Sequence, residues 1–152
     1  MKSLSKIFNT LFGIGFSPYA PGTIASAFTI ILWYSFIQFF SIYLFITLIL
    51  LVMILSIYFI NLHLTDYSSD DPREIVIDEF IGQSLPLIFL NQNSELFEIF
   101  FAFICFRIFD IYKIYPVNLG EKIKGSIGII ADDIIAGIYT IIFLMIYKII
   151  LY

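Results

Sequence analysis

The chain has 152 residues, of which 61% are hydrophobic and only 13% are charged. Soluble domains average about 45–50% apolar and about 25% charged residues, so this composition excludes an ordinary soluble domain and indicates a small integral membrane protein. The net charge of −4 argues against a nucleic-acid-binding surface, because no basic stripe is present to neutralise phosphates. We expect residues 1–152 to form a single membrane-embedded domain.

The first half of the chain predicts a loop followed by a helical hairpin. Glycines and prolines concentrate in residues 13–22, which predicts a loop there. Residues 24–64 then contain no charged side chain. This run of about 41 residues is roughly twice the 20 needed to cross a bilayer, so it predicts two helices with a turn near residues 38–41.

The second half predicts three further helices. A polar connector over residues 65–74, in which Asp71 is a candidate N-cap, precedes a helix over residues 74–90. At about 16 residues this helix is short for a full span, so it is expected to be re-entrant or steeply packed between its neighbours. The last two helices are predicted over residues 96–112 and 127–151. The expected fold is an all-α, polytopic membrane bundle of about five helices.

The positive charges predict an orientation for this bundle. With a cytoplasmic N-terminus and five crossings, the loops near residues 38–41 and 91–95 hold no cation, and only Lys148 falls on the outside. The cytoplasmic segments hold six cations: Lys2, Lys6, Arg73, Lys113, Lys122 and Lys124. Cytoplasmic loops of membrane proteins carry an excess of Lys and Arg, so the pattern favours this topology.

Acidic residues interrupt the apolar segments at three places, Asp78–Glu79, Asp110 and Asp132–Asp133. An ionised carboxylate near hydrocarbon costs at least a few kcal/mol and needs a partner, an ion or water. In the predicted topology all three places lie at the cytoplasmic end of their helices, so the acids are expected to converge at one depth. Hard oxygen ligands suit Mg²⁺, and we expect these five residues both to hold that ion and to act in catalysis.

Two adjacent acids on a helix point in different directions, so we do not expect both to bind the same group in the same way. Asp132 and Asp133 are about 100° apart around the helix, so both cannot face one point equally. We expect one of them to bind the metal directly and the other to orient a water or a second ion. Asp78 and Glu79 have the same adjacency.

Two cations flank Asp110 in the predicted fourth helix. Arg107 and Lys113 lie three residues before and three residues after Asp110, so all three share roughly one helical face. One interpretation is that the cations only neutralise Asp110. The other is that they hold phosphate oxygens, Arg107 through its fork and Lys113 as a point charge.

The loop before the first helix of the hairpin is a second candidate for phosphate binding. Residues 13–23 lead into a helix whose free N–H groups favour an anion, which makes Gly22 and Thr23 candidate contacts. The alternative is that the loop is only a membrane-entry turn. His63 is expected to be a packing residue rather than a ligand.

Three blocks of sequence resemble the phosphatidylglycerophosphatase A family: FSPYAPGT, EIVIDEFIG, and FRIFDIYKIYPV followed by GSIGIIADDIIAGIY. The resemblance implies a Mg²⁺-dependent phosphatase of the bacterial inner membrane. Such an enzyme converts phosphatidylglycerophosphate to phosphatidylglycerol and phosphate in phospholipid biosynthesis. The resemblance also implies that the essential residues are Asp78, Glu79, Arg107, Asp110, Lys113, Asp132 and Asp133. The hypothesis is in-line attack by a water that Mg²⁺ activates.

Two other functions are compatible with intramembrane acids. A small ion or proton transporter also places carboxylates in the membrane, but it would spread them through the membrane's depth. A purely structural membrane subunit would tolerate Asn at Asp78, Asp110 and Asp133. The expected partners are the lipid substrate and membrane lipids, and the sequence gives no sign of an obligate protein partner.

Overall fold

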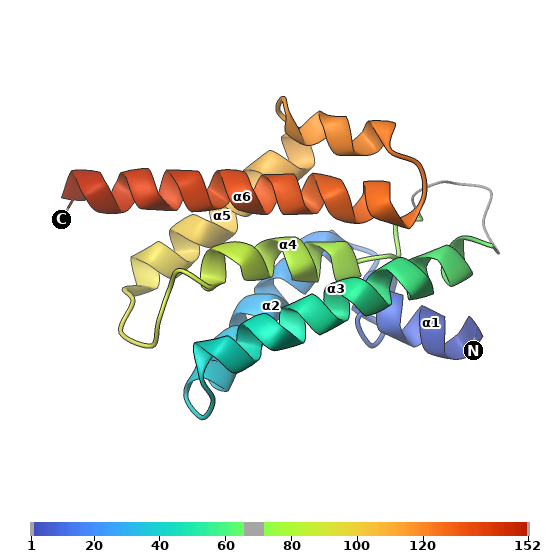
Figure 1. Ribbon diagram of the computed structural model, residues 1–152, viewed down its shortest axis with the longest axis horizontal. Helices are drawn as coiled ribbons and strands as arrows, with labels where there is room; N and C mark the ends of the chain where they lie inside the picture. Colours follow the sequence, from blue (N-terminus) through green and yellow to red (C-terminus); the bar gives the residue numbers. More distant parts are fainter. Residues whose placement is uncertain (1, 66–71, 152) are drawn as a thin grey trace.

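The computed structural model describes residues 2–65 and 72–151, and within these residues the chain is all-helical, as the sequence predicts. The candidate N-cap Asp71 lies outside the described residues. The α-helices are α1 (Lys2–Asn9), α2 (Pro21–Ile37), α3 (Ile42–Leu64), α4 (Ile77–Leu87), α5 (Leu96–Tyr112) and α6 (Ser126–Leu151). Two 3₁₀ turns, η1 (Ile14–Phe16) and η2 (Val117–Lys122), lie in the connections (Figure 1).

The predicted hairpin is present as α2 and α3, with its turn between Ile37 and Ile42. Ser41 caps α3, because its side chain accepts a hydrogen bond from the backbone N–H of Leu44. The turn between α2 and α3 lies at the same end of the molecule as the turn between α4 and α5 (Figure 1).

The N-terminal residues form a helix that the sequence analysis does not predict. α1 docks on α3 through two side chains that bond the Phe59 carbonyl: Ser5 Oγ donates at 2.7 Å and Asn9 Nδ2 donates at 2.9 Å. The Asn9 carbonyl in turn accepts a hydrogen bond from the Val76 N–H at 2.9 Å. α1 therefore fixes the chain just before it enters α4.

α4 lies at the centre of the bundle and is shorter than the predicted helix over residues 74–90. Nine of its eleven residues are buried, and α2, α3, α5 and α6 all pack against it (Figure 1). At 1.5 Å per residue it is about 16 Å long, roughly half of a 30 Å hydrocarbon core. α4 is therefore too short to cross a membrane by itself, in agreement with the expectation of a re-entrant or packed segment.

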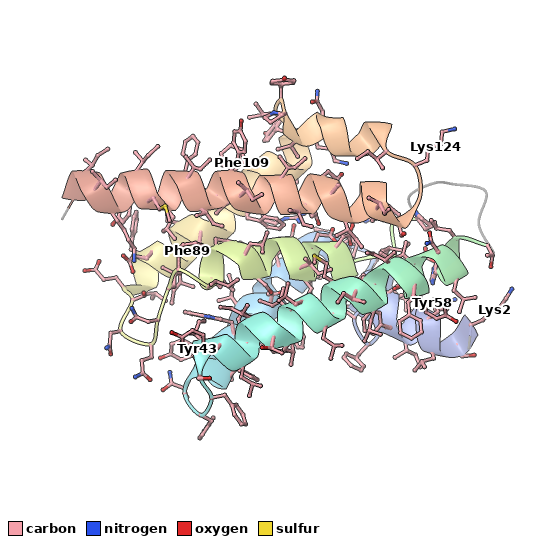
Figure 2. The ribbon with its side chains drawn as sticks, viewed as in Figure 1. Lys2, Tyr43, Tyr58, Phe89, Phe109 and Lys124 are labelled. Atoms are coloured by element: carbon pink, nitrogen blue, oxygen red, sulfur yellow. The ribbon has the colours of Figure 1, made fainter. Side chains whose placement is uncertain are left out.

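Two helices of the described chain, α3 and residues Ser126–Ile150 of α6, are long and apolar enough to cross a membrane. Only 17% of the most apolar 18-residue stretch of α3 is buried in the bundle, so this helix turns most of its apolar surface outward. Tyr43 and Tyr58 are exposed near its two ends (Figure 2). Aromatic residues at both ends of an apolar helix are typical of a membrane span.

Helices α4 and α6 approach closely because glycines stand where they cross. A Cβ atom on Gly82 would lie 2.6 Å from the Asp133 carbonyl oxygen, and one on Gly137 would lie 2.6 Å from the Gly82 carbonyl oxygen. Real Cβ atoms essentially never show such distances, so a side chain at either position would push the two backbones apart. This contact sets the position of Asp133 relative to α4.

We expect Gly137→Ala to destabilise the protein by up to about 2 kcal/mol, because overpacking against a backbone costs about 1–3 kcal/mol and Ala gains only about 1 kcal/mol over Gly in a helix. The measurement is thermal unfolding in detergent, followed by circular dichroism. Ile138→Ala is the matched control, since Ile138 is the next residue and is 46% exposed. An unchanged or raised midpoint for Gly137→Ala would contradict the close packing.

Candidate active site

One pocket of about 250 Å³ is lined by most of the charged residues that the sequence singles out. α4 contributes its first-turn acids, α5 and its C-cap contribute Arg107, Asp110 and Lys113, and α6 contributes the acids near its start. The full lining is Arg73, Ile75, Asp78, Glu79, Arg107, Asp110, Ile111, Lys113, Asp132 and Asp133. The structure thus brings the three acidic places of the sequence together.

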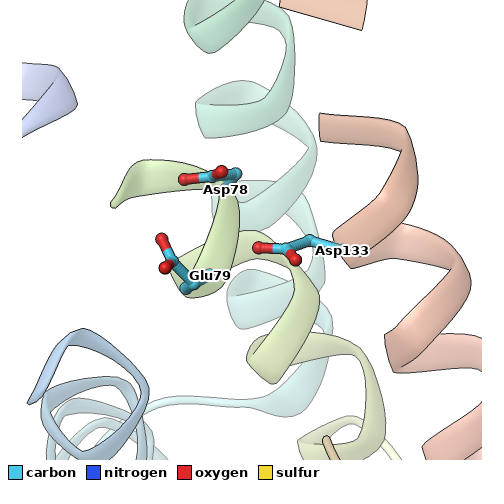
Figure 3. A group of neighbouring side chains, drawn as sticks. All are labelled: Asp78, Glu79 and Asp133. Carbon is cyan, nitrogen blue, oxygen red and sulfur yellow. The ribbon is translucent and has the colours of Figure 1, made fainter. Parts of the chain in front are cut away.

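Three of the carboxylates form a compact cluster. Asp78, Glu79 and Asp133 each offer one oxygen, and these oxygens all lie within 4.8 Å of one another (Figure 3). Among the described residues, Glu79 Oε2 and Asp133 Oδ2 are buried without a hydrogen-bond partner. A buried carboxylate oxygen without a partner costs free energy, and a cation would supply the missing interaction. An all-oxygen donor set fits a hard divalent cation such as Mg²⁺, Ca²⁺ or Mn²⁺.

The electrostatics of α4 agree with a site that needs a cation. Burial raises the pKa of Glu79 from 4.5 to about 7, and the nearby Asp110 carboxylate adds to the increase, while the Asp78 hydrogen bond and Arg107 oppose it. Burial thus disfavours the ionised form of Glu79. Metal ligands bind in their ionised form, so a bound cation would favour the carboxylate.

The five predicted acids divide into two groups. Asp133 joins the cluster with α4, whereas Asp132 Oδ2 accepts a hydrogen bond from Lys113 Nζ at 2.6 Å. The adjacent pair on α6 is therefore split between two partners, as its angular separation predicts. Asp110 forms an ion pair with Arg107. In contrast, Asp78 and Glu79 both reach the cluster although they are adjacent.

The cation Arg107 neutralises Asp110 and still has donors for another group. Its Nη1 also lies 3.5 Å from Ser26 Oγ, and its buried Nε has no hydrogen-bond partner among the described residues. A guanidinium has five N–H donors, so one carboxylate does not exhaust it. Arg107 therefore neutralises Asp110, as the first interpretation has it. It also keeps N–H donors that could bind phosphate oxygens, as the second interpretation requires.

Lys113 is held in an unusual backbone conformation at the end of α5. Its φ of 43° is left-handed, which costs a non-glycine residue about 1–2 kcal/mol. The Lys113 N–H donates to the Phe109 carbonyl at 2.9 Å and so closes the helix. Strained residues cluster at functional sites, and here the strain accompanies the ion pair that Lys113 forms with Asp132 of α6.

The start of α2 lies against the carboxylate cluster. A Cβ atom on Gly22 would collide with Glu79 Oε1 and would lie 3.2 Å from Arg107 Nη2, so a glycine permits this close approach. Thr23 is half-buried and is not among the residues that line the pocket. His63 is buried, with Nε2 3.6 Å from Glu74 Oε1, and is also not among the lining residues.

Sequence reasoning missed three residues beside the site. Ser26 contacts Arg107, Arg73 lines the pocket, and Gly120 packs so tightly on Asp132 that a Cβ atom would lie 2.5 Å from the Asp132 nitrogen. A signal existed for two of them. Ser26 lies four residues after Gly22 on one helical face, and Arg73 lies five residues before Asp78.

Carboxylates that could hold a cation lie beside an Arg and a Lys in an apolar helical bundle, an arrangement that suits metal-assisted chemistry on phosphate esters. The family model for phosphatidylglycerophosphatase A matches residues 7–148. The chain belongs to this family, and it is a lipid phosphatase.

Two relatives are each 34% identical to the chain. One, from Bacteroides thetaiotaomicron, is provisionally named a phosphatidylinositol-3-phosphatase, and the match covers 91% of this chain and 90% of the relative. The other is phosphatidylglycerophosphatase A of Escherichia coli, and the match covers 85% of this chain and 74% of the relative. No solved structure matches the chain at comparable significance. These matches give no support to the transporter hypothesis.

We expect Mg²⁺ or Mn²⁺ to raise the thermal midpoint of the wild-type protein, because a ligand at 100 times its Kd adds about 2.7 kcal/mol to the free energy of unfolding. Asp133→Asn removes one carboxylate of the cluster and should abolish most of this increase. Glu98→Gln is the control, because Glu98 is an equally buried acid that pairs with Lys148 at 3.1 Å, outside the pocket. A full metal-dependent increase in Asp133→Asn would exclude Asp133 as a ligand.

Proposed function

We propose that the chain is a Mg²⁺-dependent phosphatase that hydrolyses phosphatidylglycerophosphate to phosphatidylglycerol and inorganic phosphate in phospholipid biosynthesis. Residues 1–152 would form its single domain. Family membership supports the substrate class. The observation that carries the proposal is the pocket in which three carboxylates share one centre and Arg107 and Lys113 stand beside them.

The charge of the pocket favours a divalent ion. Five carboxyl groups and three cationic side chains line it, a formal excess of two negative charges. A phosphate monoester is itself an anion, and like charges brought together cost several kcal/mol. One divalent cation would offset the excess and let the phosphate enter.

Asp78, Glu79 and Asp133 would hold Mg²⁺, which polarises a phosphoryl group and makes water a better nucleophile when bound. Arg107 would bind phosphate oxygens through its fork and Lys113 as a point charge. Asp110 and Asp132 would orient these two cations through their ion pairs.

The start of α2 would add a phosphate contact at Gly22, which lies against Glu79 and Arg107, because the backbone there offers an anion the positive end of a helix. In the reaction, a water oxygen attacks phosphorus and gives up a proton, and the phosphorus–oxygen bond to the glycerol breaks. The glycerol oxygen gains a proton and leaves as the lipid alcohol.

We further propose a multi-pass protein of the bacterial inner membrane with this pocket at the cytoplasmic surface. Lys2 and Lys124 lie at the end of the bundle where α6 begins, and Tyr43 and Phe89 lie at the opposite end (Figure 2). Lys and Arg are enriched on the cytoplasmic side of membrane proteins, which supports this orientation.

We expect the detergent-purified protein to release phosphate from phosphatidylglycerophosphate only when a divalent cation is present. Phosphatidylinositol 3-phosphate should be assayed in parallel, because the relative from Bacteroides thetaiotaomicron carries that substrate in its name. The expected preference for phosphatidylglycerophosphate is about tenfold or more in kcat/KM. Faster release from the inositol lipid would transfer the assignment to that substrate. No release from either lipid by folded protein would refute the phosphatase.

A double variant separates the two roles of Arg107. Removing one charge-stabilising donor typically costs about 100–1,000-fold in rate, so Arg107→Gln should lose about that much activity. If Arg107 served only to neutralise its neighbour, the isosteric change Asp110→Asn would restore activity in the double variant. We expect the double variant to stay inactive in the phosphate-release assay, with Glu98→Gln again as the control that keeps wild-type activity.

A further inference from the structure

Gln83, in the middle of α4, carries a buried amide whose hydrogen-bonding groups are unmatched. The residue is 0% exposed, and neither Oε1 nor Nε2 has a hydrogen-bond partner among the described residues. Other fully buried polar side chains nearby differ, because Ser26, Thr29 and Ser84 each donate to the carbonyl four residues earlier. An unmatched buried amide costs free energy, so Gln83 calls for a partner within reach of its side chain.

The geometry of α4 directs the Gln83 side chain back toward the carboxylate cluster. Gln83 follows Glu79 by four residues, so the two lie on one helical face with about 5–6 Å between their Cβ atoms. Long side chains on a helix lean toward its N-terminus, over the residues three and four positions earlier. The clustered acids Asp78, Glu79 and Asp133 gather at that end of α4 (Figure 3). The Gln83 amide therefore reaches toward Glu79 from deeper in the bundle.

The unmatched atoms of Glu79 and Gln83 are complementary. Glu79 Oε2 is a buried acceptor and Gln83 Nε2 is a buried donor, and within the described part of the chain neither has a partner. An ionised carboxylate offers about four acceptor sites on its two oxygens, so one amide donor leaves sites for a cation. Carboxylates that bind metals are commonly held in place by such outer hydrogen bonds.

We propose that Gln83 is a positioning residue, whose amide donates a hydrogen bond to Glu79 Oε2 and holds that carboxylate toward the cation of the candidate active site. Gln83 does not line the charged pocket, so it acts on the cation only through Glu79. The inference rests on the metal site of the proposed function, but not on the identity of the lipid.

Gln83→Met tests the inference, because Met is an unbranched side chain that lacks both amide atoms. We expect Mn²⁺ to bind this variant about 10–100-fold more weakly than the wild type, as when an outer partner of a metal ligand is lost. The measurement is a Mn²⁺ titration of the purified metal-free protein, with free Mn²⁺ followed by electron paramagnetic resonance. The thermal midpoint of the metal-free protein should stay the same or rise, since the change removes unmatched buried atoms.

Two further variants separate positioning from packing. Ser84→Ala is the matched control, because Ser84 is the next residue, is equally buried and donates to the Phe80 carbonyl at 2.7 Å. It should leave the Mn²⁺ affinity unchanged. Glu79→Gln removes the carboxylate through which Gln83 acts. The double variant with Gln83→Met should therefore bind Mn²⁺ no more weakly than Glu79→Gln alone.

Several results would overturn the inference. Wild-type Mn²⁺ affinity in Gln83→Met would make the amide irrelevant to the metal, and further weakening in the double variant would show a route other than Glu79. If Gln83→Met lowers the midpoint of the metal-free protein, Gln83→Leu repeats the measurement. Affinity lost only in step with the midpoint in both variants would make Gln83 a packing residue.

Failure of the proposed function gives a different result. If the wild-type protein binds Mn²⁺ but releases phosphate from neither lipid, the phosphatase proposal fails, while weaker Mn²⁺ binding by Gln83→Met still supports the role of Gln83. If the wild-type protein binds no Mn²⁺, the metal site is refuted and the role of Gln83 is refuted with it.

Discussion

Carboxylates buried among apolar helices must be matched by positive charge, and the bundle is arranged around that requirement. Asp78 and Glu79 stand in the first turn of α4, the helix that four others enclose. Asp133 faces them from α6, and Gly82 and Gly137 let the two helices come close enough for the three carboxylates to share one centre. Without a cation, this packing would leave buried acids with unmatched oxygens.

The other charged residues complete the same arrangement. Asp110 and Asp132 are each paired with a cation, and these pairs hold Arg107 and Lys113 beside the cluster. The pocket therefore separates the clustered acids Asp78, Glu79 and Asp133 from the two acids that are paired with cations. Such a division places opposite charges within one small volume, as hydrolysis of a phosphate ester requires.

Local patterns in the sequence predict those helices in which an apolar run ends at polar residues. The α2–α3 hairpin and α5 follow from apolar runs that stop at polar residues, and the split of Asp132 from Asp133 follows from helical geometry. α1 and the start of α4 were not predictable in this way. The Val76 N–H bonds the carbonyl of Asn9, and Asn9 is held by Phe59 of α3. Contacts between residues so far apart in sequence leave no periodic signal.

The candidate active site, too, is only partly predictable from the sequence. Residue types and spacing indicate which carboxylates belong together, but not which of them takes a cation as its partner. The pairing of Lys113 with Asp132 depends on the left-handed turn at Lys113, which redirects the chain after α5. Gly120 enters the site through the packing of η2 on α6 alone.

The shortness of α4 has a consequence for how the protein is made. A segment of about 16 Å that carries two acids cannot settle in a bilayer unaided. Much of its cover comes from α6, the last helix to be synthesised. Asp133 of the carboxylate cluster also lies on α6, so the cover of α4 and the third carboxylate of the cluster arrive together. A chain that stops before α6 would lack both at once.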